Sequence, residues 1–410
     1  ISKCPHMSED ALAQLSEATA PPMKTIKVGS GDNEFTLGGE TVLFRHEKTF
    51  VSKTRYAVSL CTCMDDAAID AKLAAIPKVD YERISERMFV EMIYVNYEDG
   101  ADKDRYVEIV KKAAALGRTL VLGCKDIEAA KAALAVCKDG KPVLNGADAS
   151  NYADMSAVAT EAGVVLGVTG ADLNELYDTV AALEKAGNKN LILDVGTKSI
   201  KEAYGNAVQI RRAALKDQDR TFGYPTLVNL SVLAHGDRNL QQALASMFTM
   251  KYGSIVVMEQ LEYAEALPLF GLRQNVFTDP QKPMKVEPGI YALNGADENS
   301  LCLTTVDFAL TYFVVSGELE RSGVPCNLII SDAGGLSVLT AWAAGKLSST
   351  SVSKYIQENV EDKVKCRKLI IPGKVAVLKG DIEAKLPGWE VIVAPLEAVQ
   401  LVKFLKDLTA

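Results

Sequence analysis

Short apolar segments alternate with helical patterns from about residue 55 to residue 258, and this alternation constrains the fold more than any other feature of the sequence. The clearest helical pattern is Asp172–Ala186, in which Asp172 and Glu175 form a capping box and Gly187 follows the last turn. Strands that alternate with helices form parallel sheets, and eight of them suit a (β/α)8 barrel of the TIM type. The eight predicted strands are Tyr56–Cys61, Met88–Val95, Thr119–Cys124, Pro142–Asn145, Val164–Val168, Asn190–Val195, Thr226–Leu230 and Ser254–Met258, with further helices at Tyr106–Leu116 and Ile127–Cys137.

The residues before the barrel are predicted to form a tail and a hairpin. Residues 1–30 have the character of a tail, and Cys4-Pro5 stands out in it because Cys-Pro often ends an iron–sulfur binding run. The alternative for Cys4 is a lone exposed cysteine without partners. Apolar and polar residues then alternate between residues 24 and 50, so we predict short hairpin strands at Ile26–Val28, Phe35–Leu37 and Val42–Phe44. The barrel with its hairpin would span residues 31–278.

The carboxyl ends of barrel strands usually carry the chemistry of this fold. The residues at these ends are Cys61, Cys63, Asn96, Cys124, Asn145, Thr169, Asp194, Asn229 and Glu259. We expect no histidine or lysine to converge on them, and no spacing typical of a metal site is visible. Cys61 and Cys63 are expected to be small core residues on one face of a strand. Asp194 is either a general acid or base or, as we expect, a hydrogen-bonded carboxylate at the barrel rim. The barrel is therefore predicted to be a scaffold or docking surface.

Proline and glycine residues concentrate between residues 279 and 298, where we predict an interdomain linker that acts as a hinge. Residues 299–410 then form a shorter α/β unit that suits a small Rossmann-like domain. Its expected segments are Leu303–Gly317, a polar helix at Thr350–Val360, strands at Lys368–Ile371 and Trp389–Val393, the segment Val375–Leu378 and a last helix at Leu396–Leu408.

The stretch from Asn327 to Trp342 has the sequence of a strand, a glycine turn and the start of a helix. Gly334 and Gly335 would let the backbone pass close to a bound group, and hydroxyls follow at Ser337 and Thr340. Open α/β sheets bind ligands at such turns. The alternative is that any tight turn between a strand and a helix favours glycine.

Composition limits the classes of function. The chain has 410 residues, enough for two or three domains, and its net charge of −8 argues against nucleic acid or an anionic membrane as the main partner. No apolar run is long enough to span a membrane, and no signal peptide is visible.

The eight cysteines are scattered, which is typical of reduced thiols in a cytoplasmic protein. The three histidines disfavour a histidine metal site or a Ser-His-Asp triad. Because the first residue is Ile, we expect the natural N-terminus to lie upstream.

Several motifs together resemble one family. Four lie near the C-terminus: LTTVDFALTYFVVSGE (Leu303–Glu318), SDAGGLSVLTAWAAGK (Ser331–Lys346), IIPGKVAVLKG (Ile370–Gly380) and GWEVIVAPLEA (Gly388–Ala398). Three lie earlier: FRHEKTF (Phe44–Phe50), RTFGYP (Arg220–Pro225) and LRQNVFTDPQKP (Leu272–Pro283). The combination closely resembles the large (gamma) subunit of the corrinoid iron–sulfur protein of the acetyl-CoA (Wood–Ljungdahl) pathway, over essentially the whole chain.

The resemblance implies a methyl-group carrier rather than a stand-alone enzyme. In this family an N-terminal domain holds a [4Fe–4S] cluster on four cysteines, a (β/α)8 barrel follows, and a Rossmann-like domain binds a cobamide. Co(I) accepts a methyl group from methyltetrahydrofolate through a separate methyltransferase, and the carrier passes it to acetyl-CoA synthase. The cluster reactivates oxidised cobalt. The implied partners are a small subunit in a heterodimer, the methyltransferase and CO dehydrogenase/acetyl-CoA synthase, with no nucleic acid and no membrane.

The resemblance also implies site residues. Cobamide contacts fall on Thr305, Thr311, Gly335, Leu336, Ser337, Val338, Thr340 and Ala398, and Thr340 would lie under the lower face of the ring without ligating cobalt. The D-x-H-x-x-G motif that places histidine on cobalt in another class of cobalamin proteins is absent. Cys4 would be the last of the four cluster ligands, and residues 1–30 would be the remnant of the cluster domain and its linker.

Two other functions stay open at this point. One is a pterin-dependent methyltransferase with its own barrel active site, which would need polar groups that converge at the barrel mouth. The other is a nucleotide-binding Rossmann module, which would need a G-x-G-x-x-G turn. Gly334 and Gly335 do not extend to that pattern, so we rank the nucleotide-binding module last.

Overall fold

The computed structural model describes residues 8–279 and 284–409, and the chain divides into two compact units with the main boundary between Thr278 and Asp279. We call them the N-terminal unit and the C-terminal unit, and each is described by itself. In the part of the chain that the structure describes, no helix combines the length and the apolar character needed to cross a bilayer.

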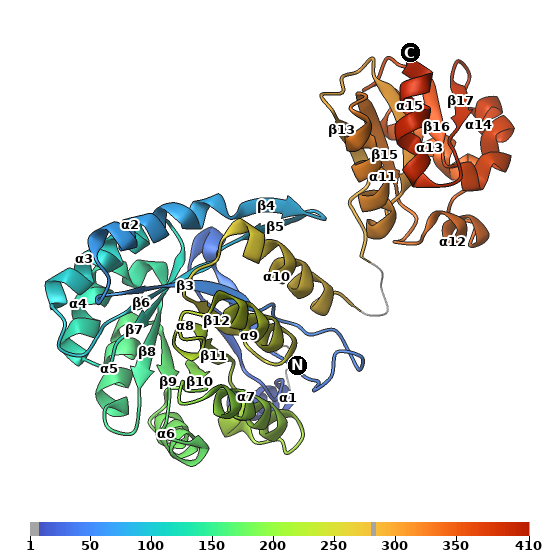
Figure 1. Cartoon of the computed structure of the whole chain (residues 1–410). Coiled ribbons are helices and arrows are strands. Elements are labelled where there is room, and N and C mark those ends of the chain that lie inside the picture. Colours follow the sequence, from blue (N-terminus) through green and yellow to red (C-terminus); the bar gives the residue numbers. More distant parts are fainter. Residues whose placement is uncertain (1–7, 280–283, 410) are drawn as a thin grey trace. The chain divides into compact units, whose positions relative to one another are not determined.

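The N-terminal unit is a closed barrel of eight parallel strands, which confirms the predicted (β/α)8 architecture (Figure 1). The strands are buried along nearly their whole length, because helices cover the outside of the barrel while side chains fill the inside. The strands are β3 (Arg55–Cys61), β6 (Met92–Asn96), β7 (Thr119–Gly123), β8 (Val143–Ala147), β9 (Val165–Val168), β10 (Leu191–Asp194), β11 (Thr226–Asn229) and β12 (Ile255–Met258). The helices of this unit that follow β3 are α2 (Asp66–Ala75), α3 (Lys103–Ala114), α4 (Ile127–Cys137), α5 (Tyr152–Ala162), α6 (Leu173–Lys185), α7 (Ile200–Leu215), α8 (Leu230–Leu233), α9 (Arg238–Met250) and α10 (Tyr263–Val276).

A hairpin covers the amino end of the barrel. Helix α1 (Glu9–Thr19) precedes β1 (Thr25–Val28), which pairs antiparallel with β2 (Phe35–Gly38). The Thr119 hydroxyl, at the first residue of β7, donates to the Asn33 carbonyl at 2.8 Å, and the Lys24 N–H donates to the Gly223 carbonyl at 2.7 Å. The carboxyl end of the barrel is therefore the end left for a ligand. The predicted strand Val42–Phe44 is wrong, because these residues form irregular structure and turns.

The predicted strand Met88–Val95 is two strands. Strand β5 (Glu86–Phe89) forms a hairpin with β4 (Asp80–Arg83), and β6 begins afterwards at Met92. Glu91 lies between them, and only 1% of its side chain is exposed. Its carboxylate forms an ion pair with Arg273 of α10, which is equally buried, and accepts a hydrogen bond from the Tyr56 N–H at 3.2 Å. This buried pair ties α10 to the first strands of the barrel.

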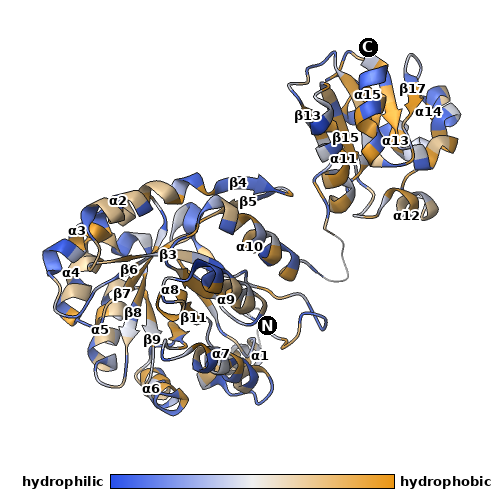
Figure 2. Cartoon of the chain, in the orientation of Figure 1, coloured by the Kyte–Doolittle hydropathy of each residue, from blue (hydrophilic) through white to orange (hydrophobic). Residues whose placement is uncertain are grey.

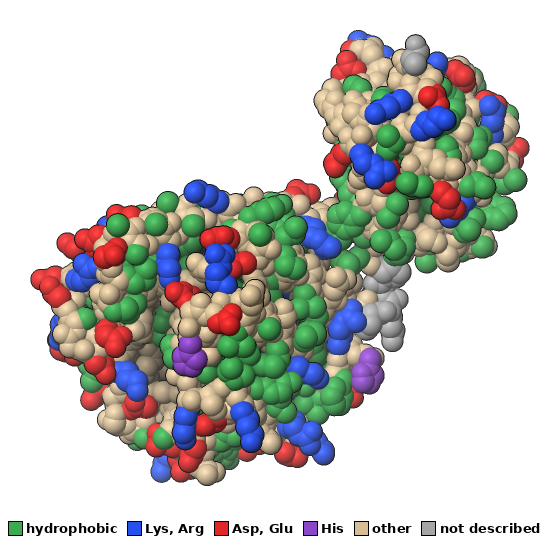
Figure 3. Space-filling model, viewed as in Figure 1, with side chains coloured by type: hydrophobic (Ala, Val, Ile, Leu, Met, Phe, Trp, Pro, Cys, Tyr) green, Lys and Arg blue, Asp and Glu red, His purple; other side chains and the backbone are tan. Residues whose placement is uncertain are grey.

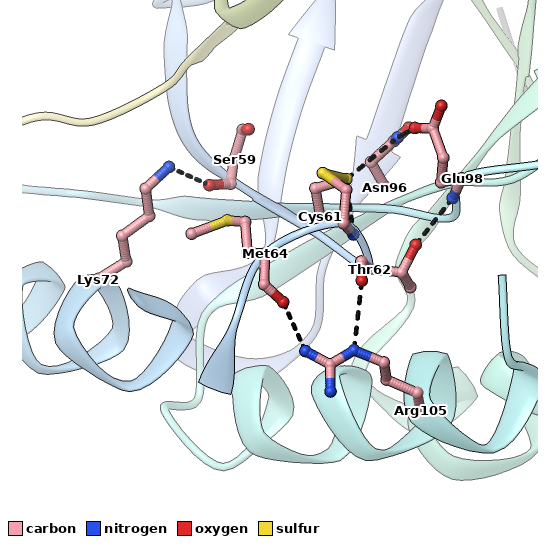
Figure 4. Close-up of a disulfide and its surroundings, with 9 residues drawn as sticks. Ser59, Cys61, Thr62, Met64, Lys72, Asn96, Glu98 and Arg105 are labelled. Carbon is pink, nitrogen blue, oxygen red and sulfur yellow. Dashed lines mark hydrogen bonds between the residues drawn. A yellow bond between two sulfur atoms is a disulfide. The ribbon is translucent and has the colours of Figure 1, made fainter. Parts of the chain in front are cut away.

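The prediction for Cys61 and Cys63 is also wrong. Cys61, the last residue of β3, forms a disulfide with Cys63 in the turn that follows, where Cys63 is exposed, so the two cysteines are neither core residues nor reduced thiols (Figure 4). Arg105 of α3 donates to the Thr62 carbonyl at 3.2 Å and to the Met64 carbonyl, which fixes the turn (Figure 4).

The C-terminal unit is built on a five-stranded sheet in the order β13-β15-β14-β16-β17. Strand β13 pairs antiparallel with β15, and the other strands are parallel. Two apolar layers cover the two faces, with α11 and α15 on one and α12, α13 and α14 on the other. Figure 2 shows the apolar strands between these helices. The bounds are β13 (Gly289–Leu293), β14 (Leu301–Val306), α11 (Ala309–Ser322), β15 (Cys326–Ser331), α12 (Val338–Ala343), α13 (Ser349–Asn359), β16 (Lys368–Ile371), α14 (Lys379–Lys385), β17 (Glu390–Val393) and α15 (Leu401–Thr409).

Three expectations for this unit need correction. The stretch 279–298, predicted as a linker, contains β13, so the sheet begins before residue 299. The segment Val375–Leu378 belongs to a 3-10 helix, Gly373–Leu378. The last helix begins at Leu401 rather than Leu396, after a 3-10 turn at Ala398–Gln400.

Candidate functional site

The C-terminal sheet reverses its winding direction at β14. The chain runs from β14 to β15 on one side and later to β16 on the other. In open α/β sheets, the loops at the carboxyl ends of the strands diverge at such a point and leave a crevice. The structure has a cavity of about 350 Å³ there, lined by residues at or after the ends of β14, β15, β16 and β17.

The structure brings most of the predicted site residues to this cavity. Thr305, Thr311, Ser337, Val338 and Ala398 line it. Gly335, Leu336 and Thr340 belong to the same turn and helix start but are not among the lining residues. Thr340 is exposed, and its hydroxyl lies 3.0 Å from the Ser337 hydroxyl. Cys4 lies outside the described residues.

One hydroxyl on the cavity wall has no partner. Thr305, at the end of β14, is 2% exposed, and its Oγ1 forms no hydrogen bond with any residue that the structure describes. Leaving a buried polar group unpaired costs about 1–3 kcal/mol. Such a group beside a cavity indicates a ligand that supplies the missing partner.

Apolar side chains on the cavity rim are unusually exposed. Leu310 and Val314 of α11, Leu339 of α12 and Leu396 after β17 all line the cavity, and Leu310 and Leu396 are 62% and 64% exposed. Figure 3 shows apolar side chains gathered on this unit along the edge where α12 lies. A contiguous apolar surface of this kind marks a binding site. We refer to these four residues as the apolar rim.

A buried carboxylate that the sequence did not reveal shapes the glycine turn. Asp307 follows β14 and is completely buried. Its carboxylate accepts hydrogen bonds from the Ala333 N–H at 2.9 Å and from the Gly335 N–H at 3.0 and 3.1 Å. Gly334 and Gly335 have φ values of 69° and 73°, a conformation that other residues rarely adopt. Asp307 and the two glycines therefore fix the turn without help from a ligand.

The opposite wall depends on another glycine. A Cβ on Gly373, after β16, would lie 2.3 Å from the Ala394 carbonyl oxygen and 2.7 Å from that of Pro395. The loops after β16 and β17 can approach this closely because residue 373 has no side chain. Lys374 and Glu397 form an ion pair of 3.6 Å beside the same cavity.

This arrangement fits a flat macrocycle with polar side arms. The apolar rim can cover the ring, and hydroxyls at Thr305, Thr311 and Ser337 can bond amide groups at its periphery. The sequence from residue 279 to residue 410 contains no histidine, so this unit offers no imidazole to a metal in the ring. Among the described residues, no cluster of His, Cys, Asp or Glu could hold a metal ion by itself.

The mouth of the barrel is more polar than the sequence suggested. Asn96, Cys124, Asn145, Thr169, Asp194 and Asn229 line a second cavity, of about 740 Å³. Cys61, Cys63 and Glu259 are not among its lining residues. Lys125 and Lys198 do line it, so the expectation that no lysine converges there is wrong.

Comparisons with known proteins find relatives over nearly the whole chain. A family profile described as CO dehydrogenase/acetyl-CoA synthase delta subunit matches residues 25–405. The corrinoid/iron-sulfur protein large subunit of Moorella thermoacetica is 36% identical over 407 residues, which cover 99% of this chain and 90% of that protein. The acetyl-CoA decarbonylase/synthase complex subunit gamma of Methanopyrus kandleri is 33% identical, with 98% and 89% covered. The corresponding subunit of Archaeoglobus fulgidus is 32% identical, with 96% and 86% covered.

Solved structures resemble the chain over about half its length. Dihydropteroate synthase from Thermus thermophilus is 18% identical, with a TM-score of 0.42, and the match covers 54% of this chain and 94% of that one. The family profile is named for the delta subunit, whereas the relatives that match over the full length are large or gamma subunits. The chain therefore belongs to the CO dehydrogenase/acetyl-CoA synthase delta subunit family, together with the corrinoid/iron-sulfur protein large subunits and the acetyl-CoA decarbonylase/synthase gamma subunits.

Proposed function

We propose that this protein carries a cobamide in its C-terminal unit and serves as a methyl carrier in acetyl-CoA metabolism. The observation that supports this most directly is the cavity beside β14. It combines the apolar rim with the buried hydroxyl of Thr305, which has no partner in residues 8–279 and 284–409. When bound, the cobalt of the cobamide would accept a methyl group from methyltetrahydrofolate and release it to acetyl-CoA synthase. The names of the full-length relatives agree with a corrinoid protein in this metabolism.

The residues of the cavity would bind and orient the cofactor. Leu310 and Leu339 would pack against the macrocycle and exclude water from it, since both are exposed and line the cavity. Thr305 would donate to or accept from an amide side arm, because its hydroxyl has no partner among the described residues. Thr340 would lie beneath the lower face of the ring. A hydroxyl is a weak donor to a metal, so Thr340 at this position would leave the cobalt without a strong protein ligand, which would favour its low oxidation states.

The proposal includes partners and a second cofactor. A carrier needs a donor and an acceptor, and we propose a separate methyltetrahydrofolate methyltransferase and CO dehydrogenase/acetyl-CoA synthase in these roles, with the small subunit as partner in a heterodimer. The printed names of the relatives include the acetyl-CoA decarbonylase/synthase complex and an iron–sulfur protein. We propose that Cys4 is the last ligand of a [4Fe–4S] cluster that keeps the cobalt reduced.

The test is to purify the protein without oxygen and to load it with a cobamide. We expect stoichiometric cobalt, a corrinoid absorption spectrum that changes on reduction, and methyl transfer from methyltetrahydrofolate that depends on an added methyltransferase. A folded protein that takes up no cobamide would overturn the proposal. Methyl transfer without an added methyltransferase would instead favour an active site in the barrel.

A further inference from the structure

The disulfide at the carboxyl end of β3 has no role in the proposed function. Cys61 is the last residue of β3, Cys63 follows in the turn, and the two Cα atoms are 5.1 Å apart. This separation is within the range that disulfides adopt, so the bond can close on the backbone as it stands. The described part of the chain contains no other disulfide.

The turn keeps its shape through hydrogen bonds that involve no sulfur. The Thr62 N–H donates to the Asn96 carbonyl at 3.1 Å, and the Glu98 N–H donates to the Thr62 hydroxyl at 2.9 Å. Arg105 donates to the carbonyls of Thr62 and Met64 (Figure 4). A disulfide that closes so short a loop also restricts the unfolded chain less than one that closes a long loop. The bond is therefore not required to hold this part of the barrel.

The two sulfur atoms differ in access and in hydrogen bonding. Cys63 is exposed, whereas Cys61 is only partly exposed. The sulfur of Cys61 accepts hydrogen bonds from the Cys63 N–H at 3.1 Å and from Asn96 Nδ2 at 3.9 Å. Donors of this kind stabilise a thiolate, and the better stabilised thiolate is the better leaving group. Cys63 is therefore the sulfur that an incoming thiolate can attack, and Cys61 is the sulfur that leaves.

Four other cysteines lack these properties. Cys124, Cys137, Cys302 and Cys326 are buried, and burial raises the pKa of each thiol to about 12. These thiols stay protonated near neutral pH, and the thiolate is the reactive form. They therefore serve as internal controls for the reactivity of the pair.

We propose that Cys61 and Cys63 form a redox-active disulfide that exchanges two electrons with a dithiol. Exposed disulfides are the labile ones, and this bond is exposed at one sulfur and not needed for the fold. The proposal goes beyond the carrier function, and it stands whether or not the C-terminal unit binds a cobamide.

The exchange has two steps. A thiolate of the dithiol attacks the sulfur of Cys63, the bond to Cys61 breaks, and Cys61 leaves as a thiolate that takes up a proton. The second thiol of the dithiol loses a proton and attacks its partner sulfur in the mixed disulfide, which releases Cys63 as a thiolate that takes up that proton. The dithiol is thereby oxidised to a disulfide, and the pair is reduced to two thiols. A disulfide of the same class reverses both steps.

The first test equilibrates the folded full chain, without oxygen or denaturant, with mixtures of reduced and oxidised dithiothreitol. The reaction is stopped with acid, and free thiols are alkylated with iodoacetamide after unfolding. Trypsin releases residues 56–72 as one peptide that contains both cysteines and no others, so mass spectrometry counts the alkyl groups on the pair. We expect the reduced fraction to follow the dithiothreitol ratio reversibly. A bond that opens only in denaturant would overturn the proposal.

The second test locates the attacked sulfur. The oxidised protein is treated briefly with reduced glutathione and stopped with acid, and fragmentation of the same peptide locates the glutathione. We expect at least about tenfold more adduct on Cys63 than on Cys61, because Cys63 is exposed and the Cys61 thiolate is the better leaving group. More adduct on Cys61 would contradict the proposed direction of attack.

Thermal unfolding separates a redox role from a structural one. The double substitution Cys61→Ser and Cys63→Ser should lower the midpoint by less than about 2 °C. Arg105→Met removes hydrogen bonds that hold the turn and should lower the midpoint further. If loss of the disulfide lowers the midpoint more than Arg105→Met does, the bond is structural and the proposal is wrong.

Discussion

Asp307 organises the glycine turn although its hydrogen-bond partners lie 26 and 28 residues later in the sequence. The sequence pattern identified the turn itself, because two adjacent glycines after an apolar strand are a local signal. The role of Asp307 depends on the pairing of β14 with β15, which no local pattern reveals. The family resemblance implied Thr305 as a site residue, and only the folded unit shows that its hydroxyl has no hydrogen-bond partner among the described residues.

Replacing Asp307 with Asn should destabilise the C-terminal unit by about 1–3 kcal/mol. The amide can keep its oxygen at the position of Oδ1, which accepts from both the Ala333 and the Gly335 N–H. Its NH2 group would then take the position of Oδ2, 3.1 Å from the Gly335 nitrogen, where two buried donors face each other. Urea unfolding measures the change. Asp362→Asn, at an exposed position of the same unit, should shift stability by less than about 0.5 kcal/mol. Equal effects of the two substitutions would contradict this account of the turn.

Replacing Thr305 with Val should weaken cobamide binding about tenfold while leaving the unliganded protein as stable as before or more stable. The valine removes a buried hydroxyl that has no hydrogen-bond partner among the described residues, and it keeps the shape of the side chain. Cobamide titration and thermal unfolding give the two values. Ser353→Ala removes another buried hydroxyl that has no partner in the described part of the chain. Ser353 lies on α13 and does not line the cavity, so this change should not affect the affinity.

Strands with two buried faces were predicted well, whereas the antiparallel edge strand β13 was missed. The barrel strands are continuous apolar segments because the barrel interior and the helices bury both of their faces. Strand β13 is the antiparallel edge of its sheet, is only half-buried, and follows Pro288. Its sequence therefore resembles a loop. The misplaced strand Met88–Val95 has a different cause, because apolar residues flank the buried Glu91 on both sides and hide the break.

Replacing Glu91 with Gln should destabilise the N-terminal unit by about 3–5 kcal/mol, because it leaves the charge of Arg273 buried without its carboxylate. Denaturant unfolding of the barrel is the measurement. Glu358→Gln breaks an exposed pair with Lys354 on α13, and its effect should stay below about 0.5 kcal/mol. A loss of less than about 1 kcal/mol for Glu91→Gln would show that the barrel does not depend on this pair.

At the scale of the whole molecule, the division into a barrel and a smaller α/β unit followed from the alternation of strands and helices along the chain. The sequence did not reveal the polar cavity at the barrel mouth. The sequence places these residues at the ends of separate strands. Which of them lie close together depends on the order of the strands around the closed barrel. Only the structure shows which charged side chains at the barrel mouth form ion pairs, such as Lys125 with Asp148.

A fragment that spans residues 284–410 should fold by itself and bind a cobamide. Its two apolar layers consist entirely of residues within that range. Cooperative thermal unfolding and cobamide uptake by the isolated fragment are the measurements. A fragment with helical circular dichroism but no cooperative transition would contradict the expectation.

The exposure of Leu310 and Leu396 has a consequence for the newly synthesised protein, before any cofactor is bound. If a cobamide covers these two side chains, a newly synthesised chain exposes an apolar surface until it binds the cofactor. In cells with little corrinoid, unliganded protein would then accumulate and tend to aggregate. The supply of corrinoid would therefore govern the solubility of the protein as well as its activity.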